Sequence, residues 1–162
     1  LIAAGTGFAQ LKAIVEAALT ENPERDISIW WAVRERRDLY AETQAREWAQ
    51  AYANVRFHAV VEAPEAALEA LPGVRWHTGR IDEVLASQLD TLEGVEIYLA
   101  GSPGMVYACV DTLAPLGLVE SQVHSDVFSY APRVPFLPLP ESDPDQAPLT
   151  PGEIASSPEK KS

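Results

Sequence analysis

The chain has 162 residues, of which 47% are hydrophobic, and a formal net charge of −12. Its length and composition allow it to bury the core of one globular domain. The negative charge disfavours nucleic acid and anionic membrane surfaces as partners, because both require a basic face. No apolar run approaches the ~20 residues of a membrane-spanning helix. A single cysteine, Cys109, excludes an internal disulfide, a Cys-x-x-Cys redox pair and a four-cysteine iron–sulfur cluster within this chain.

The first residues carry no initiator methionine, no basic flank and no small-residue cleavage site. We therefore expect a cytoplasmic protein without a secretory signal, whose sequence continues upstream of Leu1.

Residues 1–4 are apolar throughout, which predicts a buried parallel strand. Gly5 and Gly7 then form a turn, and residues 8–19 repeat apolar side chains at the period of a helix. A glycine turn between a strand and a helix lets backbone N–H groups approach a phosphate. The dinucleotide pattern G-x-G-x-x-G is incomplete here, because its third position is Gln10. From these residues alone, a phosphate site and a tight turn without a ligand are both open.

A second strand is predicted at residues 27–33 and is followed directly by Arg34, Glu35, Arg36 and Arg37. In a dinucleotide-binding sheet this position meets the adenosine ribose. Arginines there can hold the 2′-phosphate of NADPH, and Glu35 is compatible with NADH. A solvated run of charges is the alternative.

The next elements follow the same alternation of helix and strand. His58, on the third strand, is expected to be a packed or surface residue, and His77 to lie at the surface without a titratable partner. We predict, in order, a helix at 39–53, a strand at 55–61, a loop with a helical turn at 62–75, a connection at 76–80 and a helix at 81–89.

A fourth strong strand at residues 95–100 also runs into a glycine turn, Gly101-Ser102-Pro103-Gly104-Met105. Pro103 suits the first turn of a helix, predicted at 103–116, in which Cys109 is a core residue. The last strand is predicted at 122–128. The expected fold is therefore α/β, with a three-layer, Rossmann-like parallel sheet of about five strands and helices on both faces.

The composition changes at Ala131, since 8 of the 13 prolines lie in the last 32 residues among acids and serines. We expect the folded unit to span residues 1–130. Residues 131–162 are expected to form an acidic, proline-rich tail that is disordered or lies as a strap over a neighbouring surface.

The two glycine turns together resemble the NAD(P)H-binding domain of the ferredoxin–NADP reductase superfamily. In that family Gly-Thr-Gly-(Phe/Ile)-Ala-Pro follows the first strand, and Cys-Gly-Pro-Pro-x-Met follows a later one. The chain departs from these motifs at Gln10 and Ala100, and is most similar to bacterial NAD(P)H:flavin oxidoreductases, with a likeness that extends to oxygenase reductase components. Further agreement lies in Trp31-Ala32-Val33-Arg34, Asp38-Leu39-Tyr40, Val60-Val61, Gly79 and Ser125-Asp126-Val127-Phe128.

The resemblance implies a role for each predicted site residue, with no catalytic acid or base and no metal ligand. The pyrophosphate of NADH or NADPH would lie on Gly5, Thr6, Gly7 and Phe8, the adenosine end on Arg34 with Arg36 or Arg37, and the nicotinamide on Gly101, Ser102, Pro103 and Met105. Phe128 or Tyr130 corresponds to the aromatic terminus that lies against the flavin. The flavin, FAD or FMN, would be held mainly by a β-barrel domain upstream of Leu1.

The resemblance implies hydride transfer from NAD(P)H to a flavin, of which this chain supplies the pyridine-nucleotide half. Three alternatives remain at this point. The protein could be the reductase component of an oxygenase, with a ferredoxin or the oxygenase as partner. It could reduce a sugar nucleotide through an iron–sulfur centre, or it could be a non-enzymatic nucleotide-sensing or interaction module.

Overall fold

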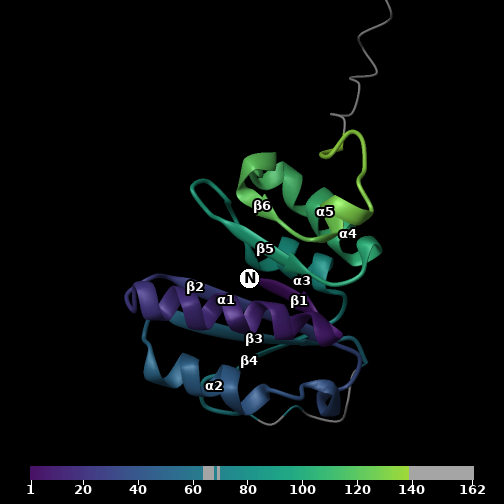
Figure 1. Ribbon diagram of the computed structural model, residues 1–162. Coiled ribbons are helices and arrows are strands. Elements are labelled where there is room, and N and C mark those ends of the chain that lie inside the picture. The colour runs from purple at the N-terminus through teal and green to yellow at the C-terminus, as the bar shows by residue number, and fades with distance from the viewer. Residues whose placement is uncertain (64–67, 69, 139–162) are drawn as a thin grey trace, which may run out of the picture.

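The computed structural model describes residues 1–63, 68 and 70–138, and these form an α/β fold with helices on both faces of a six-stranded sheet (Figure 1). The strands are β1 (Ile2–Ala4), β2 (Ile27–Val33), β3 (Val55–Val61), β4 (Arg75–Thr78), β5 (Ile97–Ala100) and β6 (Val123–His124). The helices are α1 (Phe8–Glu21), α2 (Glu42–Ala51), α3 (Ile81–Gln88), α4 (Pro103–Leu113) and α5 (Val127–Tyr130), with short 3₁₀ turns at Gly5–Gly7, Arg36–Asp38, Ala114–Leu116 and Glu120–Gln122.

The strands are ordered β4-β3-β2-β1-β5-β6, and every neighbouring pair is parallel. β1 therefore lies at the centre, where Ala3 pairs with Trp31 of β2 on one side and with Ala100 of β5 on the other. Because the strands are parallel, the carboxyl ends of β1, β2 and β5 lie at one rim of the sheet. This confirms the predicted α/β class.

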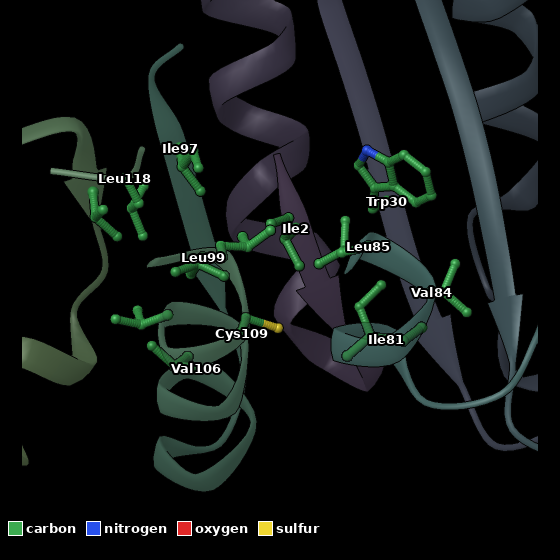
Figure 2. Packing of buried hydrophobic residues seen from close by; sticks show 14 of the residues in the cluster. Ile2, Trp30, Ile81, Val84, Leu85, Ile97, Leu99, Val106, Cys109 and Leu118 are labelled. Carbon is green, nitrogen blue, oxygen red and sulfur yellow. The ribbon is translucent and has the colours of Figure 1, made fainter. Parts of the chain in front are cut away.

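Two hydrophobic clusters fill the space between the sheet and its helices. One lies beneath α1 and α2, and the other beneath α3 and α4. Figure 2 shows the second cluster, in which Ile2 and Leu99 of the sheet meet Leu85 of α3 and Cys109 of α4. Successive strand residues face opposite layers, so Trp30 belongs to this cluster and Trp31 to the other.

The structure corrects two of the predicted elements. β4 was expected to be part of a connection, but Arg75–Thr78 pairs along β3 as an edge strand. Its four residues are exposed or half-buried, so they lack the apolar pattern that marks a central strand. The last predicted strand, 122–128, is a strand only at Val123–His124, after which α5 begins.

The packed part of the chain also continues beyond the predicted boundary at residue 130. The guanidinium of Arg133 donates to both carboxylate oxygens of Asp111 on α4, at 2.8 and 2.6 Å, and lies 4.4 Å from the ring centroid of Tyr107. Phe136 packs edge-to-face on Phe128, with ring centroids 4.7 Å apart. The first residues after α5 therefore form a strap on α4, and the rest of the predicted tail, 139–162, lies outside the described residues.

Within the described ranges, no helix combines the length and the apolar character needed to cross a bilayer.

Candidate functional site

The turn after β1 is shaped by its two glycines for different reasons. Gly5 has φ +54°, a left-handed conformation that side chains disfavour. Gly7 has an ordinary φ, but a Cβ there would collide with the carbonyl oxygen of Ala100 at the end of β5. No side chain caps the first turn of α1, and that turn contains no acidic residue. The first turn of α1 therefore carries no carboxylate of its own, but the Asp126 carboxylate reaches it from outside and accepts a hydrogen bond from the Gln10 amide.

The turn after β5 lies directly beside it. Ser102 caps α4 by accepting a hydrogen bond from the Met105 backbone N–H, at 3.3 Å, and Pro103 occupies the first helical turn. A Cβ on Gly101 would collide with the Met105 methyl group, so that side chain lies flat on the turn. Since Gly7 lies against Ala100 and β1 pairs with β5, the two glycine turns meet at one rim of the sheet.

Three aromatic side chains, those of Phe8, Trp31 and Tyr40, pack around the turn after β1. The Phe8 ring stacks on the Trp31 ring, with centroids 3.9 Å apart and planes 6° from parallel. The Trp31 indole N–H donates to the Gly5 carbonyl at 2.9 Å, and the Tyr40 hydroxyl donates to the Thr6 carbonyl at 3.3 Å. Trp31 and Tyr40 were not among the predicted site residues. No local motif indicates this role of Trp31, because it depends on the strand register, which places Trp31 beside Ala3, just before the turn.

The three predicted arginines differ in their surroundings. Arg37 forms an ion pair with Glu35 at 2.6 Å. Arg36 lies 3.6 Å from a Glu42 carboxylate oxygen and 5.1 Å from the Trp76 ring centroid. Arg34 is exposed, and within the described part of the chain it forms no ion pair. An open hollow of about 510 Å³ lies beside this segment, lined by Arg36, Arg37, Leu39, Tyr40, Glu42 and Thr43.

The two predicted aromatic residues are placed differently as well. Phe128 is half-buried between Phe136 and Tyr107, whose ring centroid is 5.8 Å away, whereas Tyr130 is 62% exposed. Phe128 also lines a second open hollow, of about 430 Å³, between α1 and β6. Across this hollow the Gln10 amide donates to the Asp126 carboxylate at 3.3 Å.

The histidine prediction was wrong for His77. His58 Nδ1 lies 2.9 Å from His77 Nε2, and the His58 ring stacks on Trp30 with centroids 3.7 Å apart. His58 is only 6% exposed. Burial, followed by the positive fields of His77, Arg75 and Arg56, lowers the pKa of His58 to about 3. Burial and Arg75 also lower the pKa of His77. Sequence alone could not reveal this pair, because it depends on the unpredicted strand β4.

Neither these histidines nor the cysteine adds a metal site to the rim. Among the described residues, no group of three or more His, Cys, Asp or Glu side chains could hold a metal ion. Cys109 is fully buried, as predicted, and burial raises the pKa of its thiol to about 12. Its sulfur lies 3.6 Å from the Met105 sulfur, so it supports Met105 from within the core.

Residues 1–111 match the model of the family described as the oxidoreductase NAD-binding domain. A reductase component of terephthalate 1,2-dioxygenase from a Comamonas species is 28% identical over 131 residues, covering 81% of this chain and 38% of that protein. An NAD(P)H-flavin reductase from Vibrio harveyi is 33% identical over 101 residues, covering 62% of this chain and 40% of that protein. The chain thus spans well under half the length of these relatives.

The fold is also shared with a solved structure. The crystal structure of an Amycolatopsis cytochrome P450 reductase is similar to this chain with a TM-score of 0.66 and 27% sequence identity, covering 76% of this chain and 35% of that one. The structural likeness, like the sequence likeness to the terephthalate dioxygenase reductase, thus extends over most of this chain.

Proposed function

Because the chain belongs to the oxidoreductase NAD-binding domain family, we propose that it binds NADH or NADPH across the carboxyl rim of its sheet, as half of an oxidoreductase that reduces a flavin. The observation that carries this proposal is the meeting of the two glycine turns, where Gly7 lies against the carbonyl of Ala100. The contact leaves no room for a side chain at Gly7, so the two turns lie side by side at the rim with glycine backbone that a ligand can approach closely. Each of them opens a helix whose amino end favours an anion.

The residues at this rim fit a dinucleotide along its length. The pyrophosphate would be held by the turn and the first residue of α1, the adenosine end by the arginines after β2, and the nicotinamide by the turn after β5. The residues proposed for the pyrophosphate are Gly5, Thr6, Gly7 and Phe8. Those proposed for the adenosine end are Arg34, Arg36 and Arg37, and those for the nicotinamide are Gly101, Ser102, Pro103 and Met105. Of the two aromatic candidates for the flavin side, Tyr130 is the more exposed and Phe128 the more firmly packed.

The chain's own contribution to the reaction would be binding and orientation. When bound, the coenzyme supplies a hydride, and a flavin accepts it. The turns would hold the phosphates, and the Met105 side chain, supported by Cys109, would form an apolar wall beside the nicotinamide turn. No side chain at the rim needs to move a proton for this chemistry. The flavin itself would be held mainly by a β-barrel domain outside this chain.

The second candidate is the reductase component of an oxygenase. It is favoured by the terephthalate dioxygenase reductase, which aligns with 81% of this chain. In that case electrons would pass from the flavin to an iron–sulfur centre, and a ferredoxin or an oxygenase would be the partner. The presence and type of a flavin-binding domain in the same polypeptide would distinguish the two candidates. A flavin barrel alone supports the flavin reductase, and a barrel with a Cys-x4-Cys-x2-Cys segment supports the oxygenase component.

The proposal is tested by titrating the full chain with NADH and with NADPH in a calorimeter. We expect saturable binding of at least one coenzyme, and an Arg34→Ala substitution should weaken it about five-fold, because an exposed arginine can hold a phosphate through charge-assisted hydrogen bonds. Arg25→Ala is the matched control. Arg25 is also exposed but precedes β2, at the amino ends of the strands and therefore at the rim opposite the proposed site, so its loss should leave the Kd unchanged.

A folded wild-type chain that binds neither coenzyme would refute the proposal. The ratio of the two Kd values also gives the coenzyme preference. A loss on Arg34→Ala that is larger for NADPH than for NADH would assign this arginine to the 2′-phosphate.

A further inference from the structure

We propose that Trp31 and Tyr40 are positioning residues for the coenzyme's pyrophosphate, because they fix the two carbonyl groups of the turn after β1. This inference rests on the proposed function and concerns residues outside the two glycine turns and the arginine segment. Trp31, on β2, bonds to the Gly5 carbonyl, and Tyr40, which follows the arginines at positions 34–37, bonds to the Thr6 carbonyl.

Trp31 sets the direction of the peptide group between Gly5 and Thr6. The indole N–H donates to the Gly5 carbonyl at 2.9 Å, so this carbonyl points to the Trp31 side chain in the buried layer beneath α1. In a trans peptide the N–H of the next residue points the opposite way, so the N–H of Thr6 is directed away from the indole and can meet a phosphate in the proposed site. The left-handed conformation of Gly5, φ +54°, makes this orientation accessible.

The same indole ring also places the start of α1. Trp31 is 0% exposed, and its ring is nearly parallel to that of Phe8, the first residue of the helix. One rigid side chain therefore links the Gly5 carbonyl to the first residue of α1. A buried indole N–H needs an acceptor, and here the acceptor is the turn itself.

Tyr40 holds the following peptide group. Its hydroxyl donates to the Thr6 carbonyl at 3.3 Å, and its ring meets those of Trp31 and Phe8 edge-on, with centroids 5.0 and 6.4 Å away. The Tyr40 ring is 57% exposed and lines the hollow beside Arg36 and Arg37. It therefore joins the turn to the segment proposed for the adenosine end.

The test compares Trp31→Phe and Tyr40→Phe with a matched control, Trp30→Phe, in the full chain. Trp30 is the adjacent residue of β2 and is also buried, at 4% exposure, but it belongs to the opposite cluster and stacks on His58. Each test variant keeps an aromatic ring and loses one hydrogen-bond donor to the turn. Calorimetric Kd values for NADH and for ADP are measured with the melting temperature of each variant.

We expect Trp31→Phe to raise the Kd for NADH about five-fold and Tyr40→Phe about three-fold, which corresponds to the usual net contribution of one hydrogen bond. The Kd for ADP, which also carries a pyrophosphate, should rise by similar factors in the two variants. Trp30→Phe should lower the melting temperature about as much as Trp31→Phe and leave both Kd values within two-fold of the wild type. A purely structural role for Trp31 would not produce this separation of affinity from stability.

If both test variants bind NADH and ADP like the wild type, the inference is wrong while the proposed function stands. If Trp30→Phe weakens binding as much as Trp31→Phe, the effect comes from general packing and the inference is again wrong. Should Trp31→Phe fail to fold, Tyr40→Phe decides the result, because it removes a single oxygen atom from an exposed residue. Failure of the folded wild type to bind either coenzyme would instead refute the proposed function itself.

Discussion

The contact between the buried His58 and the half-buried His77 predicts that the protein loses stability in mild acid. The two rings share a contact between Nδ1 and Nε2 at 2.9 Å, and His58 also stacks on Trp30. The ionisable groups that act on His58 besides His77 are Arg75, Arg56 and the amino group of Leu1, and each disfavours a positive charge on His58. The folded state therefore holds His58 in its neutral form.

The sign and size of the effect follow from the pKa of His58. Folding lowers this pKa from 6.5 to about 3, so below pH 6.5 the unfolded chain binds a proton that the folded chain does not. The stabilisation is complete above pH 6.5 and is lost as the pH falls toward 3. One pKa unit corresponds to about 1.4 kcal/mol, so the part of the free energy of unfolding that comes from His58 should fall by about 2 kcal/mol between pH 6.5 and pH 5.

The assay is urea denaturation of the wild type and of His58→Phe at pH 7 and at pH 5. Phenylalanine keeps a flat ring over Trp30 but cannot be protonated, so the variant should lose about 2 kcal/mol less than the wild type between the two pH values. His124→Gln is the control, because it removes an exposed histidine that pairs with Glu96 and leaves the histidine contact intact. Equal losses in the wild type and His58→Phe would refute the reasoning.

Two further predictions concern the rim and the core. Gly7→Ala should lower the free energy of unfolding by about 1–3 kcal/mol in urea denaturation, because the new Cβ would collide with the Ala100 carbonyl. Gly104→Ala, in the first turn of α4, meets no atom within 4 Å and should not destabilise, so equal losses would contradict this explanation. Cys109 should react with a thiol reagent at pH 8 only as fast as the chain unfolds, because it is buried and its thiol pKa is raised to about 12. Rapid labelling of the native protein, measured by mass spectrometry, would show that the thiol is accessible.

Most of the sheet could be predicted from local patterns because its central strands are short apolar runs that end in turn residues. β2 and β3 coincide with the predicted strands at 27–33 and 55–61. The strands at the two edges of the sheet could not be predicted as well from the sequence. β4 has a polar, half-exposed sequence and becomes a strand only through pairing with β3, and the predicted last strand gives way to α5 after two residues. Edge strands depend on tertiary partners more than on their own sequence.

The site was predictable where backbone geometry demands glycine and less so where side chains reach across the sheet. Gly5, Gly7 and Gly101 are visible in the sequence because substitution at these positions is strained or obstructed. The contacts of Trp31 with Gly5 and of His58 with His77 depend on strand register, which is not written in any local motif. The same holds for Arg133, whose bonds to α4 required the strap to fold back on the domain.

The order of the strands explains why the two glycine turns meet. From β1 the chain builds outward to β4 at one edge, then returns to place β5 on the other side of β1. The strand order reverses between β1 and β5, and in open parallel sheets ligands bind in the crevice at such a reversal. Part of the requirement for Gly7 therefore comes from the close approach of β5 and would exist without any ligand. For this reason Gly7 tests the fold, whereas Arg34, Trp31 and Tyr40, where substitution does not obstruct that approach, test the binding of the coenzyme.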